Sequence, residues 1–316
     1  VYCRNRYIYK KRYHHVHLIY TPTIYIYKLE TFVHSFISSI HATLFLKPHI
    51  IFYLSVGNAP FLLIPKLFGI KTIINVDGMD WDREKWGRFG RWYLSLCAYF
   101  STKLADTVVT DSFYSQAYYK KKFNKETTYI PYMVNGYKWK EKKEVLKRYG
   151  LTKEEYFVWA GRLVPDNHLD DLLHAFMLTK LKKRLVVIGS DNYQTKYLKE
   201  TKKLMKKNEK IIHTGFLPRN EYLTLIKNSY AYVETKQSGG THPTLIDSLI
   251  HAPRIICNDF PANKNITHYK AYLYKNRNID SLKKLLCGKM KISINKMKSF
   301  NKKIILSKYR EIFLYS

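Results

Sequence analysis

The amino-acid sequence predicts an α/β fold with doubly wound parallel sheets, and three observations support this prediction. Short apolar runs rich in β-branched residues alternate with amphipathic stretches of helical length along nearly the whole chain, as in successive βα units. Several of these runs end in a glycine, at the position where a doubly wound sheet binds its ligands. The chain has 316 residues, and at about 150 residues per domain this length predicts two domains.

The first predicted domain comprises residues 1–135. Its apolar, β-branched runs predict strands, at residues 16–20, 50–54, 72–76, 107–110 and 128–130. Between them, apolar residues that recur at helical spacing predict helices, at residues 29–46, 60–68, 91–104 and 112–122.

A second domain is predicted at residues 156–290. It follows a polar, lysine-rich stretch, residues 136–155, which contains no predicted strand and is expected to connect the domains. Strands are predicted at residues 156–160, 184–188, 211–213, 231–234 and 254–257. Helices are predicted at residues 169–178, 193–206, 219–227, 244–250 and 279–286, and a last helix is expected within residues 291–316.

Composition and charge limit the class of protein. Hydrophobic residues make up 46% of the chain, which excludes a wholly disordered protein. Lys and Arg number 55 against 24 Asp and Glu, a formal net charge of +31. Such an excess suits a nucleic-acid binder or an anionic membrane surface, or reflects a solvated lysine-rich surface. The lysines are spread along the chain, which favours the last two interpretations, and no nucleic-acid partner is expected.

Several classes of site have no motif in the chain. The four cysteines form no closely spaced pair, so neither a zinc ribbon nor a disulfide framework is predicted, and a reducing compartment is expected. The histidines at residues 14–17 have no acidic or cysteine residue at metal-ligand spacing, so a solvated strand edge is expected there. Neither a signal peptide nor a transmembrane helix is predicted.

The sequence SGGTHPTLID follows a predicted strand and contains the most informative motif. Gly239 and Gly240 precede a predicted helix in which Pro243 suits the first turn, because no N–H is needed there. Thr241 suits the N-cap position. Backbone N–H groups at such a helix start can bind a phosphate, and Asp247, one turn further, can accept hydrogen bonds from ribose hydroxyls. An ordinary glycine-rich turn before a capped helix remains the alternative.

Two more motifs follow predicted strands. Arg162 comes after Gly161 at the end of the strand at residues 156–160, where a guanidinium can donate several hydrogen bonds to a diphosphate. A surface arginine paired with a nearby carboxylate is the alternative. The sequence DGMDWDREKW begins at Asp77, after the strand at residues 72–76. Carboxylates beside aromatic rings at a strand end suit a sugar site, and a charged, exposed helix entry is the alternative.

Further motifs complete a pattern that spans nearly the whole chain. In order, the carrying residues are Val76-Asp-Gly-Met-Asp-Trp81, Arg83, Lys85-Trp-Gly-Arg-Phe89, Ala105-Asp106, Asp111-Ser112, Tyr129-Ile-Pro131, Gly161-Arg-Leu-Val-Pro165, Gly215-Phe-Leu217 and Gly239-Gly-Thr-His-Pro-Thr-Leu-Ile-Asp247. With these motifs the chain resembles the retaining glycosyltransferases of family 4, and within them the rhamnosyltransferase-like branch of bacterial polysaccharide biosynthesis. The resemblance implies the GT-B fold, in which two Rossmann-like domains face each other across a cleft, the first binding the acceptor and the second the nucleotide-sugar.

The resemblance also implies roles for individual residues. Arg162 matches the arginine on the donor diphosphate, and Asp247 matches the acidic residue that holds the donor ribose. Asp77 falls where many members carry a histidine near the reacting sugar, and with Arg162 and Asp247 it forms the expected catalytic set. The expected donor site comprises Gly161, Arg162, Asn167, Gly239, Gly240, Thr241, Thr244 and Asp247. The expected acceptor side comprises Gly78, Asp80, Trp81, Arg83 and Lys85.

The chain departs from the family pattern in its charged residues. The first glutamate of the family's acidic pair is replaced by Gly239, and the second is shortened to Asp247. The lysine that commonly follows the arginine by five positions is Asn167 here. One positive charge on the diphosphate is therefore missing, unless His168 or another residue supplies it, and donor affinity is the property most affected.

The activity implied is transfer of a sugar, with rhamnose a candidate, from a nucleotide-diphosphate donor to a saccharide or lipid-linked acceptor, with retention and without a metal or other cofactor. The enzyme is expected in the cytoplasm, where its basic surface contacts the anionic inner face of the membrane. A catalytically inactive relative and, behind it, a polyanion-binding protein are the alternatives. Residues 1–4 resemble the end of a second strand, so a first strand and its glycine loop are expected to be missing and the chain to be poorly stable or inactive without them.

Overall fold

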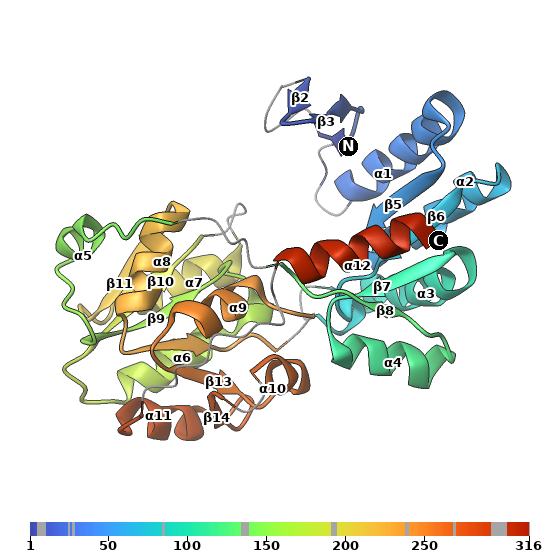
Figure 1. The fold of residues 1–316 in the computed structure, drawn as a ribbon. Helices are drawn as coiled ribbons and strands as arrows, with labels where there is room; N and C mark the ends of the chain where they lie inside the picture. The colour runs from blue at the N-terminus through green and yellow to red at the C-terminus, as the bar shows by residue number, and fades with distance from the viewer. Residues whose placement is uncertain are drawn as a thin grey trace.

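The computed structural model describes the chain except residues 5–10, 25, 27–28, 84–85, 134–138, 191–194, 238–239, 268–269, 292–301 and 316. The described residues form two α/β units that lie side by side, each built on a parallel sheet (Figure 1). The α/β prediction with parallel sheets is therefore confirmed. Within the described residues, no helix has both the length and the apolar composition required to cross a bilayer.

The first unit contains a four-stranded parallel sheet in the order β5-β6-β7-β8. Its strands are β5 (Ile50–Leu54), β6 (Lys71–Asn75), β7 (Thr107–Thr110) and β8 (Thr128–Tyr129). The connecting helices are α2 (Leu63–Leu67), α3 (Arg88–Leu104) and α4 (Phe113–Phe123), with 3-10 turns η2 (Val56–Leu62) and η3 (Asp80–Asp82). Adjacent residues of β6 face opposite sides: Ile74 packs in the core that contains α3, and Ile73 packs in a second core. Both faces of this sheet are therefore covered, which explains the continuous apolar run.

The chain start is arranged differently from the predicted strand at residues 16–20. β1 (Tyr2–Cys3) pairs in parallel with β4 (Ile19–Tyr20), and β2 (Arg12–Tyr13) pairs antiparallel with β3 (Val16–His17). The β2–β3 ribbon is exposed, as expected for a solvated edge. It is followed by α1 (Glu30–His41), which continues into a π-helical turn, η1 (Ala42–Leu46).

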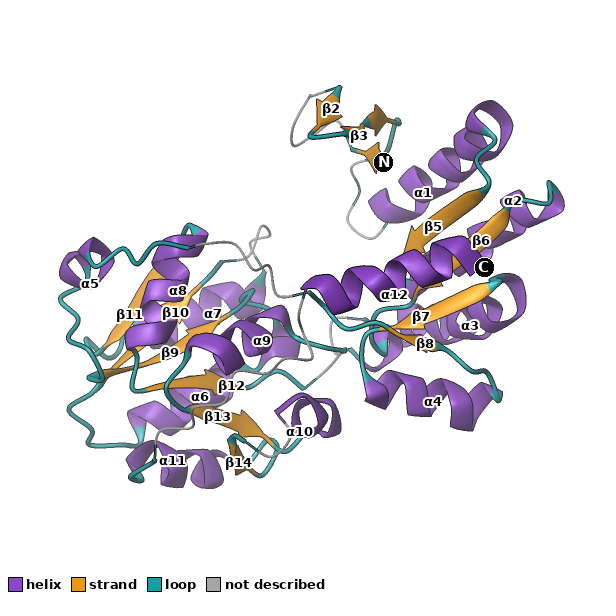
Figure 2. Ribbon diagram, viewed as in Figure 1, coloured by secondary structure: helices purple, strands orange, loops and turns teal. Residues whose placement is uncertain are grey.

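The second unit contains a six-stranded parallel sheet in the order β11-β10-β9-β12-β13-β14 (Figure 2). Its strands are β9 (Tyr156–Ala160), β10 (Arg184–Ile188), β11 (Ile211–Gly215), β12 (Ala231–Glu234), β13 (Ile255–Asn258) and β14 (Tyr272–Tyr274). Its helices are α6 (Leu169–Met177), α7 (Lys196–Met205), α8 (Arg219–Asn228), α9 (Pro243–His251), α10 (Pro261–Thr267) and α11 (Ile279–Cys287), with the 3-10 turn η4 (Pro165–Asn167). Every residue of β9 is buried, because alternate side chains enter the cores on the two faces of the sheet.

The predicted connection at residues 136–155 contains a short helix, α5 (Glu144–Arg148), which the sequence analysis missed. Val145 of this helix is fully buried in the core beside α8 and α9. The backbone N–H of Lys142 also donates to Thr224 Oγ1 of α8 at 2.9 Å. This stretch therefore packs as part of the second unit.

The last helix, α12 (Lys302–Tyr315), lies against the first unit, although it follows the second in sequence (Figure 1). Ile305 and Ile312 pack in the same core as Ile73 of β6. The Lys308 ammonium donates to the carbonyl of Tyr129 at 3.0 Å. The chain end therefore covers the second face of the first sheet and ties the two units together.

Candidate functional site

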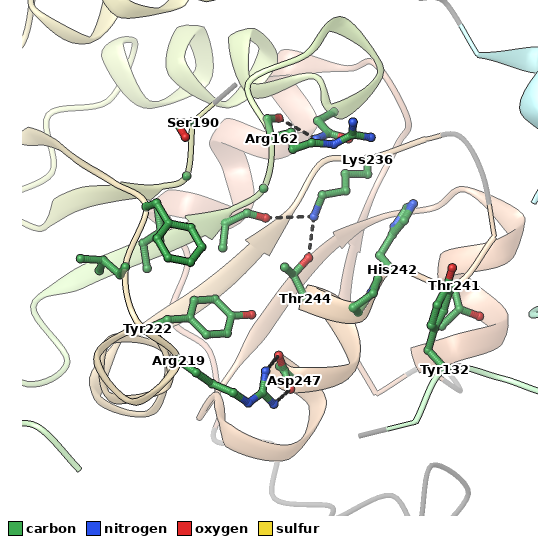
Figure 3. A pocket seen from close by; sticks show the side chains of 18 of the residues that line it. Tyr132, Arg162, Ser190, Arg219, Tyr222, Lys236, Thr241, His242, Thr244 and Asp247 are labelled. Carbon is green, nitrogen blue, oxygen red and sulfur yellow. Dashed lines mark hydrogen bonds and ion pairs between the residues drawn. The ribbon is translucent and has the colours of Figure 1, made fainter. Parts of the chain in front are cut away.

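A cavity of about 650 Å³ lies where the carboxyl ends of the two sheets face each other, and its lining comes from both units (Figure 3). The first unit contributes Asp77, Arg83 and Tyr132. The second contributes Gly161, Arg162, Asn167, Gly189, Ser190, Phe216, Arg219, Tyr222, Lys236, Gly240, Thr241, His242, Pro243, Thr244 and Asp247, with Ala160, Ile188 and Leu217. The strand ends marked by glycine in the sequence thus meet at one cavity.

Glycines at two strand ends bring the backbone close to this cavity. Gly189 follows β10 with φ +130°, and a Cβ there would lie 1.9 Å from the carbonyl oxygen of Gly161. A Cβ on Gly161 would lie 3.0 Å from Cε of Lys236. Larger residues at these two positions would displace the neighbouring strand end or the lysine, so both glycines shape the cavity floor.

Arg162 lies on the cavity wall that β9 and β12 form, as the sequence predicts. Its side chain is exposed, and no carboxylate among the described residues pairs with it. Asn167, at the position where the family resemblance implies a lysine, donates from Nδ2 to the Arg162 carbonyl at 2.6 Å. Asn167 therefore fixes the loop that carries the arginine.

Lys236 places a second cation in this wall, which no sequence motif predicts. The side chain is 7% exposed, and Nζ donates to the Ala160 carbonyl at 3.0 Å and to Thr244 Oγ1 at 2.6 Å. It also forms a buried ion pair with Glu234 at 3.2 Å. In the sequence, Lys236 is marked only by its position two residues after the apolar strand at residues 231–234. Lysines at such positions usually lie on the surface, so this pattern does not identify a site residue.

The helix start behind this wall differs in detail from the prediction. Pro243 occupies the first turn of α9 as expected, but the N-cap is His242, and no side chain caps the helix. The expectation that Thr241 is the N-cap is therefore wrong. Its N–H donates to Asp111 Oδ2 at 2.7 Å and its hydroxyl to the Asp111 carbonyl at 2.5 Å. Thr241 thus contacts the other unit and does not cap α9. Gly239 lies outside the described residues.

Asp247 lines the cavity as predicted but already has a charged partner. Arg219 donates to both of its carboxylate oxygens, at 2.8 and 3.2 Å. Tyr222 lies beside them, and burial, followed by the charge of Asp247, raises the pKa of its phenol well above the ordinary value. Arg219 and Tyr222 both line the cavity and were not predicted, since a helix-start arginine and tyrosine carry no sequence motif.

The first unit presents a carboxylate on the opposite side. Asp77 has φ +60° two residues after the end of β6, and its N–H donates to Asn75 Oδ1 at 2.9 Å. The hydroxyl of Tyr132 donates to Asp77 Oδ1 at 2.7 Å. Burial, followed by the charge of Asp77, raises the pKa of Tyr132. Asp77 is thus held at the cavity by an unusual backbone conformation and a phenol.

The expected acceptor-side residues are only partly at the cavity. Arg83 lines it and joins the two units, because its guanidinium pairs with Asp80 at 3.2 Å and with Asp166 at 3.0 Å. Trp81 is 7% exposed and packs in the core beside Tyr118, with ring centroids 5.2 Å apart. The expectation that Trp81 offers a face to a sugar is therefore wrong.

Of the remaining acceptor-side positions, the structure describes Gly78 and Asp80. Gly78 and Asp80 fall outside the described lining, and Lys85 lies outside the described residues. The cavity therefore has one wall with Arg162, Lys236 and a helix start beside the Arg219–Asp247 pair, and an opposite wall with Asp77 and Arg83. Such an arrangement can bind an anionic group on the cationic wall and a hydroxyl-bearing or electron-poor group beside Asp77.

Comparison with known families gives two matches. The model described as glycosyl transferases group 1 matches residues 141–303, just over half of the chain. A second model, described as a domain of unknown function (DUF1972), matches residues 46–135. No curated protein sequence matches the chain.

Solved structures share the fold. HepE of Anabaena, in complex with UDP and glucose, has a TM-score of 0.78 at 11% identity, covering 96% of this chain and 87% of its own. Sucrose-phosphate synthase of Thermosynechococcus elongatus has a TM-score of 0.76 at 15% identity, covering 96% and 85%. The α,α-trehalose 6-phosphate synthase of Burkholderia multivorans has a TM-score of 0.63 at 13% identity, covering 92% and 76%. At these identities the likeness concerns the fold, which is GT-B.

Proposed function

The chain belongs to the group 1 glycosyl transferases, and on this premise we propose that it moves a sugar from a nucleotide-diphosphate donor to a saccharide or lipid-linked saccharide, with retention at the anomeric carbon. The observation that carries the proposal is the cationic wall formed by Arg162, Lys236 and the start of α9. The similar structures support a nucleotide-sugar donor, since HepE was solved with UDP-glucose.

The cationic wall suits the donor diphosphate. The Arg162 guanidinium lacks a carboxylate partner among the described residues and lies exposed at the cavity. Lys236 donates to Thr244 Oγ1, so the hydroxyl proton of Thr244 is directed away from the lysine and is available to a phosphate oxygen. At the first turn of α9 the helix dipole also favours negative charge. Lys236 thus provides the second cation that the asparagine at residue 167 cannot provide.

The proposed reaction breaks the bond between the anomeric carbon and the diphosphate oxygen. The acceptor hydroxyl forms its bond on the same face of the sugar, and its proton passes to the departing diphosphate. Arg162, Lys236 and the α9 start stabilise the charge that develops on the leaving group, as preorganised electrostatic groups. Asp77 faces this region from the other unit and stabilises the electron-poor sugar ring. Ribose hydroxyls of the donor donate to Asp247, which Arg219 holds in position.

Thermal melting with a panel of UDP-, GDP- and dTDP-sugars and their bare nucleotides is the first test. A ligand that binds only the folded state raises the melting temperature, so we expect one nucleotide family to raise it and Arg162→Ala to remove the shift. NMR of the transfer product then reports its anomeric configuration. No shift with any donor, or an inverted product, would contradict the proposal.

We also propose that the protein groups named above carry the catalytic charge without a bound metal. The expected result is that EDTA leaves the transfer rate unchanged. Loss of activity in EDTA that is restored by Mg²⁺ or Mn²⁺ would overturn this part. A rhamnose donor and a role in polysaccharide biosynthesis follow from the resemblance of the motifs, and the same donor panel, with dTDP-rhamnose included, tests them.

Peripheral contact with an anionic membrane at the inner face of the cell membrane is a further part of the proposal. Phe89 and Trp92 at the start of α3 are 76% and 60% exposed, with ring centroids 5.7 Å apart. Arg88 and Arg91, also exposed, flank them. Aromatic rings beside cations suit a lipid interface. We expect sedimentation with phosphatidylserine vesicles that weakens with salt and is reduced in Trp92→Ser; equal binding to neutral vesicles would contradict it.

A further inference from the structure

Asp111 is a buried carboxyl at the junction of the two units. It directly follows β7, and Ser112 after it caps α4. Its residue is 1% exposed. The sequence motif Asp111-Ser112 takes part in the family resemblance, but neither the motif nor the proposed reaction above gives the side chain a role.

One side of Asp111 holds the glycine-rich donor loop. Its Oδ2 accepts the Thr241 N–H at 2.7 Å, and its carbonyl accepts the Thr241 hydroxyl at 2.5 Å. A Cβ on Gly240 would lie 1.9 Å from Oδ1 and 2.2 Å from Oδ2 of Asp111. The carboxyl therefore packs directly on the backbone of the loop that precedes α9.

The other side of Asp111 faces a second carboxyl. Oδ1 is buried, and no N–H group or alcohol or phenol hydroxyl among the described residues donates a hydrogen bond to it. The Asp77 carboxyl is its charged neighbour and interacts with it side chain to side chain. Two ionised carboxylates in contact repel, and a buried oxygen without a donor is unfavourable. A single proton between the two groups removes both problems, as in other carboxyl pairs.

The surroundings decide which carboxyl carries the proton. Asp77 is partly exposed at the cavity and accepts the Tyr132 hydroxyl, so its charge is solvated and hydrogen-bonded. Asp111 is enclosed, and burial, followed by the charge of Asp77, raises its pKa to about 8. The proton therefore resides on Asp111 at neutral pH, with Oδ1 as the donor to Asp77.

We propose that Asp111 is a positioning residue that, as a neutral acid, donates a hydrogen bond to ionised Asp77 while it clamps the donor loop through Thr241. The proposal rests on the transferase function above, in which Asp77 faces the reacting sugar. Through this one side chain, the docking of the donor loop and the charge state of the acceptor-side carboxylate depend on each other. When Asp111 loses its proton, the two carboxylates repel and Asp77 moves from its position.

Three phenols, Lys308 and His242 also lie around the pair. Burial raises the pKa of Tyr129 to about 12, and burial also raises the pKa of Tyr132 and of Tyr309 from α12, so these phenols stay neutral through pH 9. Lys308 contacts the Tyr129 carbonyl, and His242 follows Thr241 in the loop and lines the cavity. Variants at Asp111 therefore assign the alkaline decline to the carboxyl pair rather than to these neighbours.

The decisive experiment compares Asp111→Asn with Asp111→Leu in the full chain. Asparagine imitates the neutral acid, since its oxygen can accept the Thr241 N–H and its NH₂ can donate to Asp77. We expect wild-type kcat/KM to fall above pH 8 and Asp111→Asn to keep kcat/KM within about threefold at pH 6.5 while losing that alkaline decline. Asp111→Leu is expected to lose about 100-fold in kcat. An Asp111→Asn variant as inactive as the leucine variant would overturn the proposal, because it would mean that Asp111 must ionise.

A second readout does not depend on activity. Infrared spectra of the wild type at pH 7 are expected to show the C=O band of a protonated buried acid, which is absent from Asp111→Asn. The same proton makes the free energy of unfolding depend on pH. Because the folded pKa of Asp111 is raised, the neutral acid contributes stability at low pH, and this contribution is lost as the pH rises toward 8. Asp111→Asn cannot titrate at this position and is expected to lack this pH dependence. Absence of the acid band at pH 7 would overturn the proposal. If the band is present but no donor is turned over, the transferase function fails while the shared proton stands.

Discussion

The two walls of the cavity are held in place by different means. The wall of the second unit lies at the end of a six-stranded sheet in which the inner strand β9 is wholly buried. Its cation Lys236 donates to three hydrogen-bond acceptors. The wall of the first unit consists of residues after short strands, where Asp77 depends on a left-handed backbone and on the hydroxyl of Tyr132. The cationic wall is therefore preorganised by the core, whereas the carboxylate wall depends on a few individual contacts.

The largest expected effect concerns the buried ion pair in the wall of the second unit. Lys236→Met leaves Glu234, which is 0% exposed, without its cation, and breaking such a pair costs about 3–5 kcal/mol of unfolding free energy. Urea unfolding measures it. The double variant with Glu234→Gln is the matched control and is expected to recover most of the stability but not donor binding. Equal stability of Lys236→Met and the wild type would show that this wall does not depend on the pair.

Arg162 tests the same wall without disturbing the core, because its side chain is exposed. Arg162→Ala is expected to reduce kcat/KM by about 100- to 1,000-fold, the usual consequence of removing a preorganised group on a leaving oxygen. Arg162→Lys serves as the comparison and should recover part of the rate. The melting temperature without donor should stay unchanged in both. A small loss of rate in Arg162→Ala would assign the diphosphate to Lys236 and the helix start instead.

The contact between the two units is tested at Gly240, which packs against Asp111. A Cβ there would overlap the Asp111 carboxyl at 1.9 Å, so Gly240→Ala is expected to separate the donor loop from the first unit and to cost about 1–3 kcal/mol of unfolding free energy, as overpacking does. Combining it with Asp111→Ala, which removes the clashing atoms, should reduce the additional cost. Additive losses in the double variant would mean that the two residues do not meet in solution.

The smallest expected effect lies in the wall of the first unit. Tyr132→Phe removes one hydrogen bond to Asp77, worth about 1 kcal/mol, or about fivefold in kcat. The carboxylate then loses the donor that holds Oδ1 in place. Steady-state kinetics at saturating donor measure the loss in kcat, with donor binding by thermal melting as the control. An unchanged kcat would show that the Tyr132 hydroxyl does not support the carboxylate.

The secondary structure of the second unit was largely predictable. The strands β9, β10 and β12 coincide with the predicted ranges, because both faces of a parallel sheet are covered and the strands form continuous apolar runs. By contrast, α5, α10 and β14 were missed. These elements are short or polar, and their position depends on packing against neighbours rather than on a local pattern.

The candidate site was predictable where strand-end glycines, a helix start or the motifs shared with the family mark it. Gly161, Arg162, Asn167, Gly240, Thr241, Thr244 and Asp247 all line the cavity, as does Asp77. Trp81 lies in a segment whose carboxylates and aromatic rings suit a sugar site, but its side chain packs in a core. The sequence contains no sign of this, since an aromatic ring beside carboxylates occurs both at sugar sites and at buried helix entries.

By itself, the sequence determined the α/β class, the strand ends marked by glycine and the helix start at Pro243, because helical and strand periodicities and glycine chemistry act over a few residues. Only the tertiary structure decided which residues meet across the cavity. Asp111 contacts Thr241 across 130 positions, and Arg83 contacts Asp166 across 83. Such pairs depend on how the two sheets dock, and docking is set by the shape and charge of whole surfaces, which no short stretch of sequence encodes.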